Sequence, residues 1–339
     1  MGKSKKRYHK NRQAKISRHK SKRRRNKKRK NVGLHKLRLH QQGKYSSNHY
    51  QKRNLKAKWK KIVLPEELSI VNNTEQVLSD FNYYQKMLKE GYDIEFDLSK
   101  VQSMTPETLA FLVSNVADKN VVRNNRIKGN FPKNLKITEM LFDSGFFNFV
   151  KTRSARPKVK HRLIHKTTDY KVEVDEAKKA CLLSVNHTFG NDTKFRPLYE
   201  ILIECMANTK NHAYKADEPK YDWWLFVYKK PNNVTAVTFL DLGIGIFRSY
   251  PVLHHVRFKK GLSSNAKIIN DLYSGKIKSR TKSTQRGKGI PHIYNHSQNS
   301  NFSKFYLITN DVFSNMKTGE KFELKQELNG TLYYWELEA

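Results

Sequence analysis

Glu204 and Asn208 are two polar residues whose types and spacing could do chemistry together. Residues 197–214 carry apolar side chains at helical spacing, and residues four apart in a helix lie on nearly the same face. A carboxylate and an amide in that arrangement can share one cluster of water and metal. His212 follows about 80° further round the same helix. The spacing therefore predicts a polar site on one side of a helix over 197–214.

A second candidate segment begins where a strand-like run ends. Residues 234–240 are rich in β-branched and aromatic side chains, which favours a strand. Asp241 follows that run directly, and Gly243 and Gly245 come next. The carboxylate would emerge at the end of the strand, and the two glycines would let the backbone approach a ligand closely.

A third candidate segment, Arg286-Gly287-Lys288-Gly289, precedes a helix predicted from Ile290. The N-terminal amides and the dipole of a helix favour phosphate, and Lys288 would add a positive charge. Taken singly, each of the three segments is also typical of an ordinary helix face or turn.

In this order and spacing the three segments, together with Asn329-Gly330-Thr331, resemble a known ATPase domain. It is the GHKL domain shared by gyrase, a heat-shock chaperone, histidine kinases and mismatch-repair proteins, and the likeness is strongest to its anti-sigma-factor kinase branch. The resemblance covers about residues 160–339. It implies a two-layer α/β sandwich in which ATP and Mg²⁺ lie between a mixed sheet and a mobile lid.

The resemblance also implies roles for individual residues. Glu204 would act as the general base, Asn208 would hold Mg²⁺, and Asp241 would accept a hydrogen bond from the adenine amino group. The residues expected to bind the nucleotide are Asn208, His212, Asp241, Gly243, Gly245, Gly287, Lys288, Gly289 and Thr331, with Ser279, Arg280 and Lys282 as further candidates in the lid. One departure from the family pattern is Pro291, where a small residue is usual. Proline suits a first helical turn, so we expect nucleotide binding to survive it.

Residues 94–101 form a strand-like run, and a predicted helix with Leu109, Ala110 and Leu112 follows them. This stretch makes residues 62–150 resemble a STAS domain, the fold of anti-sigma-factor antagonists. In that family the helix begins with Asp-Ser and the serine is phosphorylated. Thr105-Pro106 occupies those positions here, so the usual phosphoacceptor is absent and Thr105 is predicted to be a helix N-cap.

Residues 1–61 hold 26 Lys or Arg and no Asp or Glu, whereas the rest of the chain holds 41 against 30. Charge repulsion and the missing apolar period oppose a packed core, so we expect a disordered arm that binds DNA or RNA through counterion release. A tail that only aids solubility, or a nuclear-localisation signal, would have the same composition. The densest run expected to bind nucleic acid is Lys20, Lys22, Arg23, Arg24, Arg25, Lys27, Lys28, Arg29 and Lys30.

Two cysteines, Cys181 and Cys205, cannot form the disulfide framework of a secreted protein. No stretch approaches the ~18 uninterrupted apolar residues of a membrane span. We therefore expect a protein of the cytoplasm, without a membrane partner, that keeps both thiols in its core.

The chain is predicted to be an α/β protein with a basic arm at 1–61, a STAS-like domain at 62–150, a linker at 151–162 and a GHKL domain at 163–339. His161 and His165 are interpreted as linker residues, because the Glu and Pro expected around a sensor-kinase phosphoacceptor are missing. Residues 248–288 are predicted to be a long polar connection suited to a lid, and residues 322–337 a final hairpin.

Three functional hypotheses follow. The first is a switch protein that binds ATP, hydrolyses it slowly and acts with DNA or RNA, in a setting such as bacterial stress response or phage defence. The second is an anti-sigma-type protein serine/threonine kinase, which would need a separate STAS partner because Pro106 removes the acceptor within the chain. The third is a non-catalytic scaffold that binds nucleic acid. The STAS-like segment would serve a protein partner or self-association.

Overall fold

A computed structural model describes most of the chain from Lys58 onward, and this part belongs to one compact unit. The described residues are 58–122, 125–152, 163–192, 194–213, 222–249, 264–277 and 289–339. They combine helices with parallel and antiparallel sheets, so the prediction of a mixed α/β chain is confirmed. No helix in these ranges is long and apolar enough to cross a membrane. The basic run from Lys20 to Lys30 lies outside the described residues.

Residues 58–152 are built around a small parallel sheet with the strand order β1-β3-β5. Its strands are β1 (Trp59–Val63), β3 (Asp93–Asp97) and β5 (Ile127–Gly129). Ile94 and Phe96 of the central strand are fully buried, because alternate residues of a strand point to the covered face of a sheet. Since β1 begins at Trp59, the last three residues of the segment 1–61 lie in a strand.

Two helices dominate this part of the chain, α3 (Thr74–Lys89) and α4 (Pro106–Ala117). The shorter elements are β2 (Glu67–Leu68), β4 (Ser103–Met104), α5 (Lys119–Val122), α6 (Leu135–Asp143) and the 3-10 helix η1 (Phe146–Asn148). Helix α4 begins where predicted, with Thr105 in the extended N-cap conformation and Pro106 as its first residue. The Thr105 hydroxyl does not bond the helix backbone but lies 2.9 Å from the hydroxyl of Thr108.

The rest of the chain carries a five-stranded antiparallel sheet with the order β6-β7-β8-β10-β9. The strands are β6 (Leu163–Asp169), β7 (Trp223–Lys229), β8 (Thr235–Asp241), β9 (Phe302–Asn315) and β10 (Lys321–Leu337). Strands β7 and β8 form a hairpin, and Asn232 and Asn233 in its turn both have positive φ. Asparagine tolerates that conformation better than most residues, which explains the turn.

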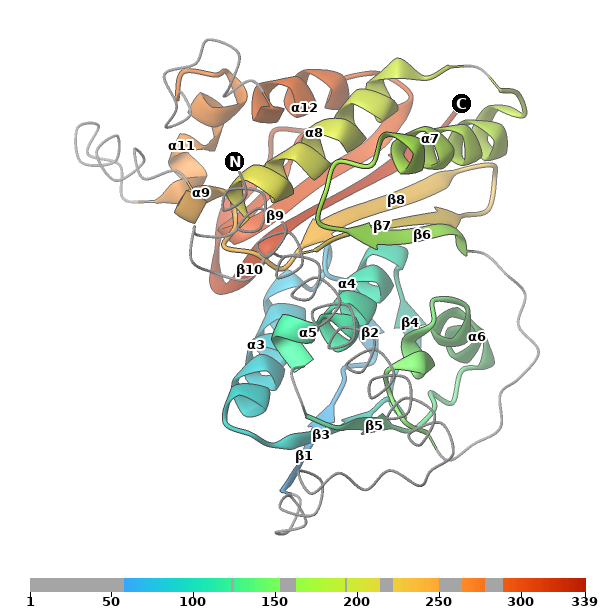
Figure 1. Cartoon of the computed structure of the whole chain (residues 1–339), viewed down its shortest axis with the longest axis vertical. Helices are drawn as coiled ribbons and strands as arrows, with labels where there is room; N and C mark the ends of the chain where they lie inside the picture. Colours follow the sequence, from blue (N-terminus) through green and yellow to red (C-terminus); the bar gives the residue numbers. More distant parts are fainter. Residues whose placement is uncertain are drawn as a thin grey trace, which may run out of the picture. The chain divides into compact units, whose positions relative to one another are not determined.

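One face of this sheet carries helices, as Figure 1 shows for α7 and α8. The helices are α7 (Val174–Phe189), α8 (Arg196–His212), α9 (Ile246–Ser249), α11 (Asn265–Tyr273) and α12 (Gly289–Ser297). Their buried side chains share one core with Trp223, Phe239 and Trp335 of the sheet. Cys181 and Cys205 are both buried free thiols, so their predicted place in the core is confirmed.

The opposite face of the same sheet packs against α3 and α4. Phe226, Leu332 and Tyr334 belong to one core together with Phe81 of α3 and Phe111 of α4. The expected two-layer sandwich with a mixed sheet is therefore corrected: helices cover both faces of the large sheet, and its five strands are antiparallel throughout.

Polar contacts supplement the packing of the two layers. The Glu75 carboxylate of α3 accepts the backbone N–H groups of Lys325 and Gln326 at 2.6 and 3.0 Å. Within the sheet and its β7–β8 turn, the buried carboxyl of Glu336 accepts from Lys230 at 2.7 Å and from the Tyr334 hydroxyl at 2.5 Å.

Three sequence interpretations need correction. The segment 248–288 contains the helix α11, whose Ile268, Ile269 and Leu272 are buried in the core. Residues 321–337 form a single strand paired with β9, and a bulge near Gly330 replaces the predicted turn. His165 lies in β6, buried 2.9 Å from the Glu176 carboxylate, and not in a linker. Residues 153–162, which hold most of the predicted linker and His161, lie outside the described residues.

Candidate functional site

A pocket between α8 and the ends of the central strands brings together residues that are far apart in the sequence. Its predicted members are Asn208, His212, Asp241, Gly245 and Thr331. Cys205, Phe239, Ile290 and Tyr333 give it an apolar lining. The pocket therefore combines an apolar body with a few polar groups, and its cavity of about 30 Å³ has room for about two water molecules in this structure.

Helix α8 positions the first pair of predicted residues. Its apolar stripe, which includes Leu198, Leu202 and Cys205, is fully buried against the sheet. Glu204 and Asn208 are half-buried on the neighbouring face, four residues apart as expected. The helix thus presents a carboxylate and an amide at the rim of the pocket.

Asp241 is the last residue of β8 and is buried, with only 6% of its surface exposed. Burial raises the pKa of its carboxyl to about 6, against the effect of two donors that favour the ionised form. These donors are the backbone N–H of Gly243 at 2.9 Å and the hydroxyl of Thr209 at 3.3 Å. The carboxylate is therefore fixed in one orientation at the bottom of the pocket.

The loop after Asp241 is held from two sides. A Cβ on Gly243 would overlap the backbone oxygen of Ala213, and the N–H of Ile244 donates to that same oxygen at 2.9 Å. Gly245 has φ +78, and a Cβ there would lie 2.5 Å from the Asn310 amide. Both glycines thus permit close backbone approaches, to α8 and to β9.

Asn310 anchors the same loop from β9. Its Nδ2 donates to the Ile244 carbonyl at 2.8 Å, and its Oδ1 accepts the N–H of Phe247 at 3.0 Å. Thr309 next to it accepts the N–H of Ile246 at 3.0 Å and lies 3.3 Å from the Thr331 hydroxyl. Neither Thr309 nor Asn310 was predicted as a site residue. The signal in the sequence was the polar run Thr309-Asn310-Asp311 between the apolar residues 305–308 and 312–313 of the strand.

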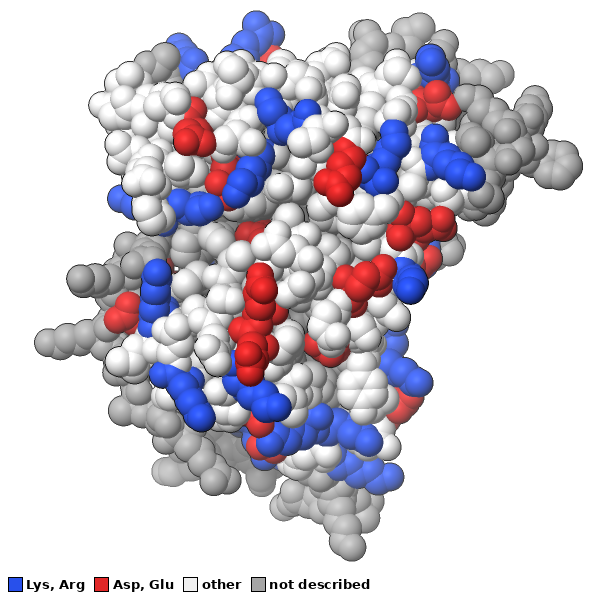
Figure 2. All heavy atoms as spheres, turned by 180° about the vertical axis from the view of Figure 1, so that it is seen from behind, with Lys and Arg blue, Asp and Glu red and all other residues white. Residues whose placement is uncertain are grey.

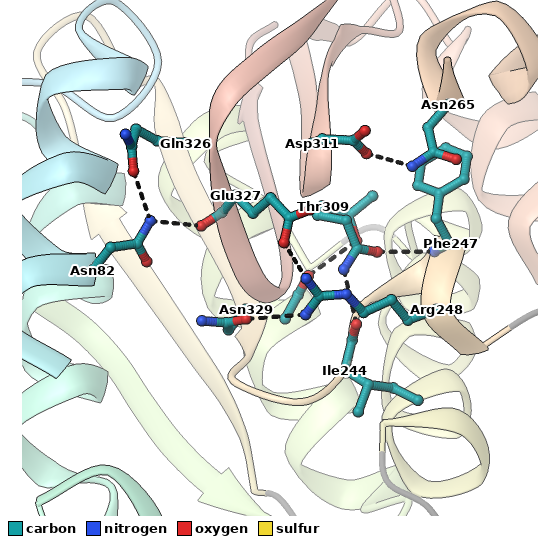
Figure 3. A network of polar contacts seen from close by, with 12 residues as sticks. Asn82, Ile244, Phe247, Arg248, Asn265, Thr309, Asp311, Gln326, Glu327 and Asn329 are labelled. Atoms are coloured by element: carbon teal, nitrogen blue, oxygen red, sulfur yellow. Dashed lines mark hydrogen bonds and ion pairs between the residues drawn. The ribbon is translucent and has the colours of Figure 1, made fainter. Parts of the chain in front are cut away.

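Figure 3 shows that these contacts continue toward α3. Arg248, just after the loop, pairs with the Glu327 carboxylate and donates to the Asn329 side chain at 3.2 Å. Asn82 of α3 donates to the Glu327 backbone oxygen at 3.1 Å. The irregular part of β10 is therefore held by α9 on one side and by α3 on the other.

Gly289, the first residue of α12, lies directly over the α8 pair. A Cβ at Gly289 would lie 2.9 Å from Glu204 Oε2 and 2.9 Å from Asn208 Oδ1. Pro291 is the third residue of α12, so its predicted position in the first helical turn is confirmed. Gly287, Lys288 and the lid candidates Ser279, Arg280 and Lys282 lie outside the described residues.

The oxygen donors of Asn208 and Glu204 suit a hard cation that also binds water and phosphate. Among the described residues no group of three or more His, Cys, Asp or Glu could hold a metal ion. Asn208 offers one amide oxygen at the rim of the pocket, beside the Glu204 carboxylate. Magnesium usually takes one or two protein oxygens and completes its shell with water and phosphate, so this donor set fits Mg²⁺ carried by a phosphorylated ligand.

Comparisons with known proteins give no family assignment. No protein-family model matches the chain, and a search of curated proteins found no significant match.

Proposed function

We propose that residues 163–339 form a Mg²⁺-dependent ATP-binding and hydrolysing domain of the GHKL type. The proposal includes a STAS-like segment at 62–150 and a basic arm at 1–61 that binds DNA or RNA. The observation that carries it is the meeting of Asn208, Asp241 and Thr331 in one pocket with Glu204 and Gly289 at its rim. Four segments that are far apart in the sequence thus contribute to one site.

The inner end of the pocket suits a purine base. Phe239 and Tyr333 give apolar surface, and Asp241 offers a buried carboxylate that can accept from an exocyclic amino group. A site built to pair with a donor discriminates strongly against ligands that lack it, because the buried acceptor would stay unpaired. Adenine carries an exocyclic amino group that can donate to Asp241. It therefore fits the inner end of the pocket better than a purine with a carbonyl at the same position.

The outer end suits phosphates and a metal. Asn208 would hold Mg²⁺, which when bound neutralises phosphate oxygens and makes the γ-phosphate easier to attack. Gly289 brings the backbone of α12 close to Asn208 and Glu204 without a side chain of its own. Gly287 and Lys288, immediately before it, would add backbone amides and a positive charge.

Glu204 would accept the proton of the attacking water. It lies one helical turn before Asn208, and the Glu204 carboxylate is half-buried and directed toward the start of α12. A positioned general base typically contributes ~10² to 10⁴ in rate. A Glu204→Gln variant should therefore bind ATP normally and turn it over poorly.

Calorimetry with Mg-ATP tests nucleotide binding. The parent chain should bind, whereas Asn208→Ala and Asp241→Ala should each bind at least tenfold more weakly. Lys178→Ala, an exposed substitution on α7, is the matched control and should bind like the parent. Absence of binding by the parent chain would refute the proposal.

Labelled γ-phosphate then separates hydrolysis from phosphotransfer. Hydrolysis releases free phosphate, and that release should be lost in Glu204→Gln. Label on a protein serine or threonine, in stoichiometric yield and with little free phosphate, would favour the kinase alternative instead.

The nucleic-acid part of the proposal is supported by the distribution of charge. The arm is purely basic, whereas Figure 2 shows Lys and Arg interspersed with Asp and Glu on one face of the described residues. Removing residues 1–57 leaves β1 intact and should abolish binding to DNA and RNA. For the full chain log K should fall with log salt at about −0.7Z to −0.9Z for Z phosphates neutralised. Unchanged binding by the truncated chain would contradict the assignment to the arm.

A further inference from the structure

Helix α12 packs along α8 through two histidine–glutamate pairs. Nε2 of His296 lies 2.6 Å from Glu200 Oε2, and Nδ1 of His292 lies 3.5 Å from Glu204 Oε1. The two histidines are four residues apart in α12, and the two glutamates are four residues apart in α8. Each pair of like residues therefore lies on one face of its helix. The order of the pairs is reversed between the helices, which therefore run antiparallel.

The two pairs differ in what surrounds them. Glu200 is held twice, because Arg196 Nε lies 2.5 Å from its other oxygen. The His296–Glu200 pair joins the two helices and lies one helical turn away from Glu204, the predicted catalytic carboxylate. Glu204, in contrast, is paired with His292, whose side chain is half exposed at the rim.

Both oxygens of Glu204 face the start of α12. Oε1 faces His292, and Oε2 faces Gly289, where a Cβ would lie 2.9 Å away. Both oxygens of this carboxylate on α8 therefore lie against α12.

Helix α12 is itself firmly held. Ile290 and Ile293 are buried in the core, and the Tyr294 ring stacks on Tyr273 of α11 with 4.4 Å between ring centroids. The Tyr273 hydroxyl in turn lies 2.9 Å from the Ser314 hydroxyl of β9. A residue on such a helix can hold a partner side chain in one rotamer.

We infer that His292 is a positioning residue for Glu204. Its Nδ1 lies 3.5 Å from Oε1 and, as a donor on the firmly packed α12, would restrain the carboxylate that accepts the proton of the attacking water. The inference rests on the proposed ATP hydrolysis and adds to it a residue on α12 that the motif comparison does not include. It also separates the two histidines, since His296 would act only in joining the helices.

The test compares matched variants in the full chain. His292→Ala should lower kcat for ATP about tenfold or more, a part of what a general base contributes, and leave the Kd for ATP within twofold. His292→Asn, whose amide can replace the Nδ1–H donor, should recover most of the rate. His296→Ala is the control and should keep kcat close to that of the parent, with at most a lower Tm.

A double-mutant cycle makes the assignment specific. In a Glu204→Gln background His292→Ala should have no further effect on kcat, because the group it positions is gone. Equal kcat values for His292→Ala and the parent would overturn the inference while the proposed function stands. Equal losses in His292→Ala and His296→Ala would also overturn it, as would a loss that persists in the Glu204→Gln background. If the parent chain neither binds nor hydrolyses ATP, the proposed function and this inference both fail.

Discussion

Asp241 and Thr331 lie directly opposite each other in the neighbouring antiparallel strands β8 and β10. Thr331 is in turn opposite Thr309 of β9, so three adjacent strands contribute one polar residue each at the same level of the sheet. Strand pairing fixes these positions through the backbone. The inner end of the pocket is therefore rigid, whereas its rim is formed by α8 and α12.

The first prediction concerns the pH dependence of nucleotide binding. The pKa of Asp241 is raised to about 6, so the carboxylate becomes protonated as the pH falls through 6 and becomes a weaker acceptor. At pH 5 about one tenth of the carboxyl groups would be ionised, and the affinity for ATP should fall up to about tenfold between pH 7.5 and pH 5.

The phosphates of ATP titrate in the same range, so the measurement is a comparison with Asp241→Asn by calorimetry. The asparagine variant keeps an acceptor oxygen without a titratable proton. The ratio of the two Kd values should change with pH between 7.5 and 5. A ratio that stays constant would remove Asp241 as the source of the pH dependence.

The second prediction concerns Gly330. Its φ is +127, and a Cβ there would overlap the backbone oxygen of Asp241. Gly330→Ala should therefore lower the free energy of unfolding by more than the roughly 1–2 kcal/mol expected for a left-handed residue alone, and should weaken ATP binding. Gly319→Ala is the control, since Gly319 has φ +79 but open space around it. Equal losses in urea unfolding of the two variants would show that contact with Asp241 is unimportant.

The third prediction concerns Glu107 at the start of α4. Only 2% of this residue is exposed, and Oε2 has no hydrogen-bond partner among the described residues. Burial, with a smaller contribution from the nearby Glu336, raises the pKa of its carboxyl from 4.5 to about 7, although hydrogen bonds from Thr105 and from the backbone of Glu107 act in the other direction. The folded state thus holds this proton more tightly than the unfolded state does.

Stability should accordingly fall as the pH rises from about 4.5 to about 7, by an amount of about 3 kcal/mol for this group. Glu107→Gln should remove that loss and make the protein more stable than the parent at pH 8. Urea unfolding at pH 5 and pH 8 checks both statements. Parallel pH profiles for the two proteins would contradict the assignment to Glu107.

The sequence predicted those features that depend on local periodicity. Glu204 and Asn208 follow from helical spacing, and Asp241 follows from its place at the end of a strand. The apolar run 223–228 also indicates how the sheet is covered. Every residue of that run is buried, and a continuous apolar run is typical of a strand covered on both faces. It could have indicated that α3 and α4 pack on the second face of the sheet.

Other features depend on contacts between distant segments, which one sequence does not display. Helix α11 is only nine residues long and lies between polar segments, so its apolar residues were not recognised as a helical face. The segment Asn329-Gly330-Thr331 was recognised only through the family resemblance, whereas the structure shows that Gly330 brings β10 close to Asp241. The role of Asn310 arises only when β9 lies beside the loop at 243–247.

The last prediction therefore concerns Asn310, which the motifs did not include. It is buried, has φ +50, and makes two hydrogen bonds to the loop after Asp241. Each bond contributes about 1 kcal/mol, and alanine is disfavoured at positive φ, so Asn310→Ala should lower the free energy of unfolding by about 2–4 kcal/mol. It should also weaken ATP binding, because the loop would lose its anchor on β9.

Asn232→Ala is the matched control for this substitution. Asn232 has φ 60 in the exposed turn between β7 and β8, at the other end of β8 from Asp241. Its replacement should lower the stability by about 1 kcal/mol and leave the affinity for ATP unchanged. Thermal unfolding with and without Mg-ATP measures both quantities in the same samples. If Asn310→Ala lost stability but gained as much from Mg-ATP as the parent, Asn310 would support the fold without holding the nucleotide loop.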